Sequence, residues 1–289
     1  VTFQTMNGQV AAVRGVDLDV APGEMVGVVG ESGSGKSVTF LGIMGLLPNS
    51  AIITGSATVD GIELVGAENK VMRQVRGKKI AMIFQDPLSA LNPVYRVGDQ
   101  IVEMIQSHQN LSKDAARTRA IELLDIVGIP QPKQRSRQYP HEFSGGMRQR
   151  VMIAMAISND PDVLIADEPT TALDVTVQAQ ILEVIQRIQN EMNKAVVMIT
   201  HDLGVIARVA DRVQVMYAGR VVERAGVDDL FSHPTHPYSE GLLNSLPRVG
   251  QTRLQPIPGR PPNMLRPPEG CAFSARCEYS TERCLVGLP

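Results

Sequence analysis

The sequence predicts an α/β fold built on a mainly parallel sheet, with a helical lobe inserted into it. Short, predominantly apolar segments at residues 25–29, 79–84, 163–166 and 195–200 have the length and composition of buried strands. Segments of helical periodicity alternate with them, as expected for a parallel sheet covered on both faces. Between residues 87 and 160 the pattern is helical alone, so this stretch is expected to form a separate lobe.

The first part of the chain is rich in predicted strands. Residues 10–29 alternate in polarity along most of their length, which is typical of strands with one buried face. A helix is expected over residues 38–47, because Pro48 cannot continue it. Residues 51–64 form a second strand-rich patch.

The later helices have recognisable start and stop signals. Ser112 is a candidate N-cap for a helix that Gly128 ends. A second helix is expected to begin near Met147. A third is predicted over residues 175–192, where isoleucines recur along one side.

Composition excludes several classes of protein. The chain has 289 residues, of which 43% are hydrophobic, so disorder is not its dominant state. Lys and Arg number 28 against 30 Asp and Glu, and the resulting net charge of −2 argues against a nucleic-acid partner. Aromatic residues make up only 4% and Trp is absent, which disfavours a site that stacks bases or sugars.

The sequence also bears on the compartment. No segment approaches the roughly 20 apolar residues that a membrane-spanning helix needs, and no signal-peptide pattern opens the chain. Because the chain begins with Val1 inside a strand-like segment, we expect its true N-terminus to be missing. Three cysteines fit a reducing cytoplasm better than a disulfide scaffold.

A phosphate-binding loop is predicted at residues 30–37, where GESGSGKS matches the pattern G-x-x-x-x-G-K-[ST]. It lies between a predicted strand and a helix, whose N-terminus favours an anion. Lys36 is expected to contact the β and γ phosphates and Ser37 to bind Mg²⁺. The nucleotide-binding residues expected here are Gly30, Ser32, Gly33, Ser34, Gly35, Lys36, Ser37 and Val38. The alternative is a surface turn rich in Gly and Ser.

Two adjacent carboxylates end the apolar strand VLIADE at residues 163–168. Asp167 suits Mg²⁺, and Glu168 suits polarisation of the attacking water as a general base. Two solvated acids at a strand end would look the same on their own, but the phosphate loop favours the catalytic interpretation.

Four further motifs occur between and after these two. FSGGMRQ at residues 143–149 is similar to the signature motif LSGGQ, FQDP at 84–87 to a Q-loop, TALD at 171–174 to a D-loop, and THD at 200–202 to a switch-histidine motif. With this order and context, residues 1–225 resemble the ATP-binding-cassette (ABC) ATPases.

That resemblance implies a P-loop ABC ATPase fold with a mainly parallel core sheet, an antiparallel β subdomain and an inserted helical subdomain, plus a Pro- and Cys-rich C-terminal extension. The implied segments are a core with the antiparallel subdomain at 1–86, the helical subdomain with the signature motif at 87–160, the continued core at 161–225 and the extension at 226–289.

The resemblance also implies a head-to-tail dimer that holds two ATP molecules between its subunits. Ser144, Gly145 and Gly146 would then bind the γ-phosphate held by the partner's phosphate loop. The same three residues begin a predicted helix, and such an N-terminus suits an anion. Asp174 would couple the two sites.

Other site roles carry over in the same way. His201 would contact the γ-phosphate and hold the attacking water, and Gln85 would contact Mg²⁺ or water and link nucleotide state to the helical lobe. For His201 the alternative is a hydrogen-bonded histidine at the end of a strand. For Gln85 the alternative is an ordinary polar residue in a turn. The implied catalytic residues are Glu168, His201, Lys36 and Gln85, and the implied Mg²⁺ ligands are Ser37, Gln85 and Asp167.

One feature departs from the family pattern. Members commonly stack adenine on an aromatic residue shortly before the phosphate loop, whereas residues 7–10 contain none and Phe3 lies early in the chain. How adenine is held therefore stays open.

Within the family, the chain is most similar to the ATP-binding subunits of dipeptide and oligopeptide permeases. The matching stretches are AMIFQDPLSALNP at 81–93, YPHEFSGGM at 139–147, IADEPTTALDV at 165–175 and HPTHPY at 233–238. The resemblance implies a peripheral subunit on the cytoplasmic face of the cell membrane. Its implied partners are a second, homologous ATP-binding subunit, separate or fused, two transmembrane permease subunits and an extracytoplasmic peptide-binding protein.

Three alternatives stay open at this point. Nickel and glutathione importers share the same features and would change only the cargo. A soluble ABC ATPase that acts on DNA or ribosomes would carry paired cassettes, long arms or basic linkers, which this chain lacks. A non-hydrolysing regulatory partner is disfavoured because Glu168 and His201 are both present.

Three cysteines follow a stretch with six prolines at residues 256–268, which predicts an extended connector. Cys271, Cys277 and Cys284 favour a metal over a disulfide in a reducing compartment. Some relatives hold a [4Fe–4S] cluster here with a fourth Cys, which would have to lie beyond Pro289 or elsewhere. Zinc and unligated thiols are the alternatives, and His233 and His236 are expected to be structural.

Overall fold

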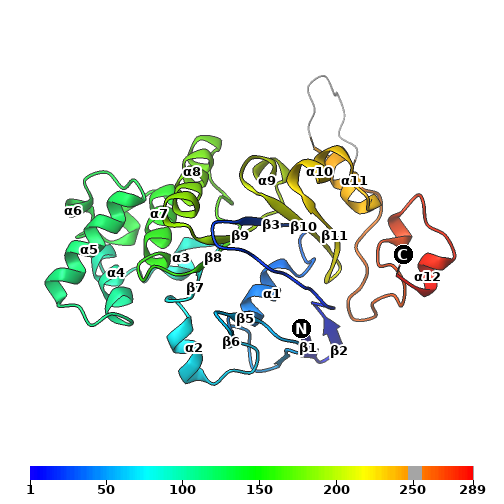
Figure 1. The fold of residues 1–289 in the computed structure, drawn as a ribbon, viewed down its shortest axis with the longest axis horizontal. Helices are drawn as coiled ribbons and strands as arrows, with labels where there is room; N and C mark the ends of the chain where they lie inside the picture. The colour runs from blue at the N-terminus through cyan, green and yellow to red at the C-terminus, as the bar shows by residue number, and fades with distance from the viewer. Residues whose placement is uncertain (247–255, 289) are drawn as a thin grey trace. The chain divides into compact units, whose positions relative to one another are not determined.

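The computed structural model describes residues 1–246 and 256–288, and Figure 1 shows its ribbon. The chain forms two compact units. One comprises Val1–Asp19, Val26–Gly66 and Ile199–Pro289, and the other comprises Val20–Met25 and Ala67–Met198. The predicted boundaries at residues 86, 160 and 225 stay predictions, and residues 247–255 and 289 of the predicted 226–289 segment lie outside the described residues.

The largest sheet has six strands in the order β11-β10-β3-β9-β8-β7. These are β3 (Met25–Val29), β7 (Ile80–Ile83), β8 (Val163–Asp167), β9 (Ala195–Ile199), β10 (Arg212–Tyr217) and β11 (Arg220–Gly226). Strands β10 and β3 pair in parallel, as do β7 and β8, while β11 is an antiparallel edge strand. Strands β3, β7 and β9 are buried along their whole length. The predicted α/β fold with a mainly parallel sheet is confirmed.

Short antiparallel strands belong to the first unit. β1 (Thr2–Thr5), β2 (Gly8–Ala11) and β4 (Ala51–Ile52) form one sheet, and β5 (Thr58–Val59) pairs with β6 (Ile62–Glu63). The predicted strand-rich patch at residues 51–64 is therefore present as three two-residue strands. Helix α1 (Lys36–Ile43) begins two residues before its predicted start at residue 38.

The prediction of strands over residues 10–29 is wrong for residues 12–24, which form none. Side chains satisfy the carbonyl groups of two residues in this segment, Asp17 and Asp19. The Gln214 amide donates to the Asp17 carbonyl oxygen at 3.2 Å, and the Arg212 guanidinium donates to the Asp19 carbonyl oxygen at 2.9 Å. Alternating polarity alone does not show which groups will take these hydrogen bonds.

Most helices of the second unit lie in the stretch predicted to be helical. Its helices are α2 (Asn69–Val75), α3 (Pro87–Ala90), α4 (Val97–Gln106), α5 (Lys113–Ile126), α6 (Pro132–Arg135), α7 (Gly145–Ala156) and α8 (Val175–Met192), with the short 3-10 helix η1 (Pro140–Glu142). The Ser112 hydroxyl accepts from the Ala115 N–H at 3.2 Å, and Gly128 has the left-handed φ of 74°. Both predicted ends of α5 are thus confirmed, and α8 has its predicted bounds.

The rest of the first unit is helical and irregular. It contains α9 (Leu203–Val209), α10 (Val227–Ser232), α11 (Pro237–Asn244), the 3-10 helix η2 (Ser274–Arg276) and α12 (Arg283–Val286). Residues 256–270, which carry the prolines, form neither helix nor strand. Throughout residues 1–246 and 256–288, no helix combines the length and apolar composition that crossing a membrane requires.

Candidate functional site

The predicted phosphate loop joins β3 to α1, and its backbone takes conformations that favour glycine. Gly30, Gly33 and Gly35 have φ angles of 150°, 80° and 100°. A Cβ atom on Gly35 would lie only 2.6 Å from the Ala12 carbonyl oxygen, and one on Gly30 would overlap the carbonyl oxygen of Met216. The loop therefore has both the left-handed backbone and the close packing that require glycine.

Lys36 and Ser34 supply polar groups to the same loop. The Lys36 ammonium donates to the carbonyl oxygens of Gly30 at 2.7 Å and Glu31 at 3.1 Å, and the side chain is almost fully buried. The Ser34 hydroxyl is buried, and no described group forms a hydrogen bond with it. The glycine-rich loop backbone, together with the Lys36 ammonium that lies against it and the Ser34 hydroxyl, suits the binding of a phosphate group. Ser37 and Val38 follow in the first turn of α1.

Glu31 is held from two sides by residues far along the chain. Its carboxylate receives two hydrogen bonds from Arg276, at 2.8 and 2.9 Å, and its backbone N–H donates to the Tyr238 hydroxyl at 2.8 Å. Glu31 and Tyr238 lie within the motifs at residues 30–37 and 233–238, but no role was predicted for either of them or for Arg276. No sequence signal links them, because residues 31 and 276 are 245 positions apart.

The second unit brings Gln85 and Glu168 together. The Glu168 carboxylate accepts from the Gln85 side-chain amide at 3.0 Å and from the Thr171 hydroxyl at 2.9 Å. Glu168 also has a φ of 46°, a left-handed conformation that costs free energy in a residue other than glycine and is typical of functional sites. The neighbouring Asp167 is buried at the end of β8. Thr171 was missed, although it lies within the predicted D-loop.

The signature motif forms the beginning of α7. Ser144 is the N-cap, and its hydroxyl accepts from the Met147 N–H at 3.3 Å. Gly145 and Gly146 lie in the first turn, where backbone N–H groups have no partner within the helix. A Cβ atom on Gly146 would overlap a γ-methyl group of Val177 in α8. Gly146 thus permits close packing of α7 on α8, and the motif presents an exposed helix N-terminus.

Asp174 and His201 occupy the ends of other elements. Asp174 is the N-cap of α8 and accepts from the Val177 N–H at 2.9 Å, so it has a local structural role. His201 follows β9 and is exposed, directly before Asp202, which caps α9. The nucleotide roles of Asp174 and His201 stay predictions.

The three cysteines lie in the irregular C-terminal part of the first unit. They line a cavity of about 320 Å³ together with His236 and other residues. The Cys271 N–H donates to the Cys284 carbonyl oxygen at 2.8 Å, and the Cys284 Sγ lies 3.5 Å from the Thr281 hydroxyl. Burial raises the pKa of the Cys277 thiol, while hydrogen bonds from Thr281 lower the pKa of Cys284.

The iron–sulfur prediction gains no support from this arrangement. Outside residues 247–255 and 289, no group of three or more His, Cys, Asp or Glu side chains could hold a metal ion. The His236 ring instead accepts from the Tyr238 N–H at 3.1 Å and caps α11, and burial lowers its pKa. The residues present therefore do not fit a cluster, and His236 is structural, as expected.

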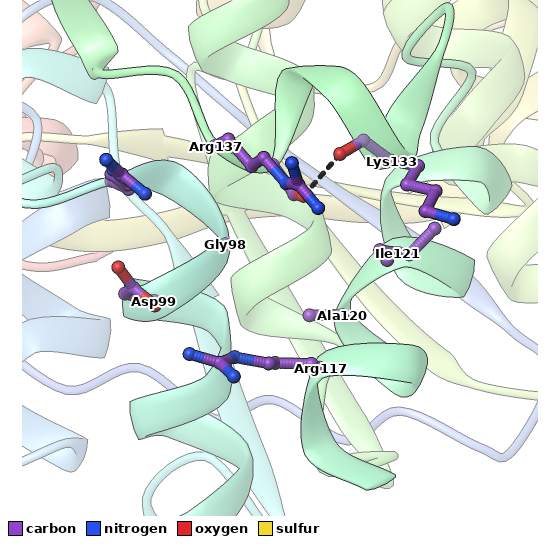
Figure 2. A pocket seen from close by; sticks show the side chains of 9 residues that line it. Gly98, Asp99, Arg117, Ala120, Ile121, Lys133 and Arg137 are labelled. Carbon is purple, nitrogen blue, oxygen red and sulfur yellow. Dashed lines mark hydrogen bonds between the residues drawn. The ribbon is translucent and has the colours of Figure 1, made fainter. Parts of the chain in front are cut away.

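A basic cavity of about 310 Å³ lies in the helical part of the second unit (Figure 2). Its lining includes Arg96, Arg117, Lys133 and Arg137, all exposed, with one carboxylate from Asp99. None of the predicted nucleotide or catalytic residues lines it. The cavity is therefore separate from the motifs that carry the nucleotide chemistry.

Comparison with known proteins agrees with these features. The family described as "ABC transporter" matches residues 13–171, which is more than half of the chain. The chain belongs to the ABC transporter family. Residues 222–284 of this ABC protein also match the family described as "Oligopeptide/dipeptide transporter, C-terminal region". The predicted resemblance to peptide-permease subunits is thereby confirmed.

Several curated relatives carry the name "Oligopeptide transport ATP-binding protein OppD". The protein from Mycobacterium tuberculosis is 56% identical and is matched over the whole chain and 48% of its own length. Those from Bacillus subtilis and Escherichia coli are 53% and 51% identical, over 97% and 100% of this chain and 80% and 86% of their own lengths. The chain thus spans about half the length of the mycobacterial relatives and most of the other two.

Solved structures of ABC cassettes are similar to this ABC protein. The ATP-binding cassette MJ0796, solved as a dimer in a post-hydrolysis state with ADP and Pi, has a TM-score of 0.69 and 28% identity. The match covers 78% of this chain and 95% of MJ0796. CbiO1 from Clostridium perfringens has a TM-score of 0.67 and 26% identity, covering 81% and 88%.

The packing at the signature motif leads to a stability prediction. Replacing Gly146 by Ala should lower the free energy of unfolding by about 1–3 kcal/mol, because the added methyl group overlaps Val177. Gly145→Ala is the matched control, since its Cβ would lie 3.6 Å from Leu173 Cδ2, an ordinary contact. Chemical denaturation measures both. Adding Val177→Ala to Gly146→Ala should recover much of the loss, and equal stability of the two single variants would contradict the packing account.

Proposed function

We propose that this chain is an ATP-hydrolysing subunit that powers import of dipeptides or oligopeptides across the cell membrane from its cytoplasmic face. The observation that carries the proposal is the phosphate loop, with its left-handed glycines and the buried Lys36 folded onto its carbonyl oxygens. The names of the relatives and the match of residues 222–284 to a peptide-transporter region favour peptides over nickel or glutathione.

The proposed partners follow from the same family. They are a second ATP-binding subunit, two transmembrane permease subunits and an extracytoplasmic peptide-binding protein. The net charge of −2 gives no support to nucleic acid as a partner.

The loop is proposed to hold the phosphates of ATP. Its backbone N–H groups and Lys36 would bind phosphate oxygens, and the unsatisfied Ser34 hydroxyl offers a further donor. Ser37, Asp167 and Gln85 are oxygen-bearing residues of the kind that Mg²⁺ binds. When bound, Mg²⁺ would neutralise charge on the phosphate oxygens.

Glu168 is proposed as the general base of hydrolysis. The water oxygen bonds to the γ-phosphorus while the bond to the β–γ bridging oxygen breaks, and a proton of the water passes to Glu168. The hydrogen bonds from Gln85 and Thr171 orient its carboxylate for this task. His201 would hold the water against the γ-phosphate.

Hydrolysis is proposed to occur in a head-to-tail dimer. Support comes from the dimeric state of MJ0796 and from the exposed N-terminus of α7 in this chain. Ser144, Gly145 and Gly146 would bind the γ-phosphate on the partner's loop. Asp174, at the start of α8, would couple the two sites.

Replacing Glu168 by Gln should preserve ATP binding while lowering turnover by a factor of about 10²–10⁴, because an amide cannot accept the proton. We would measure ATP affinity and the hydrolysis rate in the transporter reconstituted with its permease and binding-protein partners, with and without a peptide library. Peptides should stimulate hydrolysis by the unmodified chain.

Glu191→Gln provides a matched control, because Glu191 is an exposed glutamate at the far end of α8 and is expected to leave turnover unchanged. Full turnover by the Glu168→Gln variant would contradict the base assignment. Stimulation by nickel or glutathione instead of peptides would change the proposed cargo.

Complementation tests the dimer. One preparation carries Ser144→Glu, which places a negative charge where the γ-phosphate is expected, and another carries Lys36→Ala. Each variant alone should be inactive. Because a mixed dimer of two copies keeps one intact loop opposite one intact signature motif, mixing should restore about a quarter of the wild-type rate on random pairing. No recovery on mixing, from variants shown to exchange subunits, would contradict action across the dimer.

A further inference from the structure

Arg276 connects the C-terminal part of the chain to the first residues of the phosphate loop. It lies in η2, directly before Cys277, and its side chain is only 4% exposed. Its two terminal nitrogens reach the two carboxylate oxygens of Glu31 at 2.8 and 2.9 Å. This is a bidentate pair, the geometry in which Arg recognises carboxylates most strongly.

Every N–H donor of this guanidinium has an acceptor. Besides the two bonds to Glu31, it donates to the Tyr217 hydroxyl at 3.2 Å and to the carbonyl oxygens of Pro258 at 2.7 Å and Ile257 at 3.4 Å. An arginine has five such donors, so all are satisfied. Because all five donors are paired, the orientation of the guanidinium is fixed. The same hydrogen bonds also give partners to the Pro258 and Ile257 carbonyl groups of the proline-rich segment.

The Glu31 backbone is held by a second residue from the same unit. Its N–H donates to the hydroxyl of Tyr238, which is fully buried in α11. The Tyr238 ring packs against Tyr217 and Phe273, with centroids 4.5 and 5.4 Å apart. Both the side chain and the backbone of Glu31 are thus fixed by an aromatic and guanidinium cluster that includes the C-terminal segment.

The charge of Glu31 matters because of where it lies. It is the second residue of the loop GESGSGKS, and its side chain is 28% exposed. An unpaired carboxylate at this position would repel the polyphosphate that the loop is built to bind. Arg276 cancels that charge and at the same time holds the start of the loop.

We propose that Arg276 is a positioning residue of the nucleotide site, which sets the affinity of the phosphate loop for the β and γ phosphates of ATP through Glu31. The C-terminal segment at residues 256–288 is then part of the ATP site and not only an appendage. This inference rests on the proposed ATP-binding function and adds a residue to it.

The test compares equilibrium binding of ATP and AMP, with Mg²⁺, by the full chain and its variants. Arg276→Met should weaken ATP binding at least tenfold but AMP binding less than twofold, because AMP lacks the β and γ phosphates. Arg276→Lys, which keeps the charge and loses the fork, should be intermediate. Arg283→Met is the matched control, since Arg283 is an exposed arginine of the same segment.

Glu31 variants separate this role from a merely structural one. Glu31→Gln alone should weaken ATP binding less than Arg276→Met does, since it removes a negative charge near the phosphates but leaves Arg276 only one of its two side-chain acceptors at this position. In the Arg276→Met background, the same change should restore most of the lost ATP affinity. A structural role predicts instead that both single changes weaken ATP and AMP alike, in step with a fall in melting temperature.

Three results would overturn the inference. They are unchanged ATP affinity in Arg276→Met, equal losses for ATP and AMP, and no recovery from Glu31→Gln in the double variant. If Arg276→Met does not fold, Arg276→Lys decides, because an unchanged ratio of ATP affinity to AMP affinity in that variant overturns the proposal. Failure of the unmodified chain to bind ATP would instead remove the proposed function itself.

Discussion

The conformation of the phosphate loop is the constraint on which the nucleotide chemistry depends. Its left-handed glycines let the backbone approach neighbouring carbonyl oxygens closely. The Lys36 ammonium donates to the Gly30 carbonyl oxygen within the loop, and the Glu31 carboxylate accepts from Arg276 outside it. Burying the Arg276 guanidinium is expensive unless every donor is paired, and here all of them are. The fully paired Arg276 guanidinium therefore holds Glu31, and with it the start of the phosphate loop, in place.

In the second unit, the residues proposed for catalysis and phosphate binding lie just after strands or at the start of a helix. Glu168 follows a buried strand, Gln85 follows another, and Ser144 begins a helix that packs closely on its neighbour. The strained backbone at Glu168 lies beside the two hydrogen bonds that orient its carboxylate. Strands and helices thus position the residues proposed for catalysis, and hydrogen bonds from Gln85 and Thr171 in the connecting segments orient the Glu168 carboxylate.

Features that depend on residues close together in the sequence could be predicted, whereas contacts between distant residues could not. The bounds of α8 and the Ser112 cap of α5 follow from neighbouring residues, and the loop motif GESGSGKS is contiguous. The strands predicted within residues 12–24 do not form, and there side chains from far along the chain donate to the carbonyl oxygens of Asp17 and Asp19. The Glu31–Arg276 pair was unpredictable for the same reason. Three closely spaced cysteines indicated a cluster, yet in the described parts of the chain no group of three or more His, Cys, Asp or Glu side chains could hold a metal ion.

Backbone hydrogen exchange with and without ATP and Mg²⁺ tests the central claim most directly, namely that the backbone of residues 30–37 binds the phosphates of ATP. With the Glu168→Gln chain, so that ATP persists, we expect the largest slowing in peptides that cover residues 30–38. Slowing at residues 143–149 should appear only at protein concentrations that support the dimer. Protection confined to other parts of the chain, with no change at residues 30–38, would contradict the account.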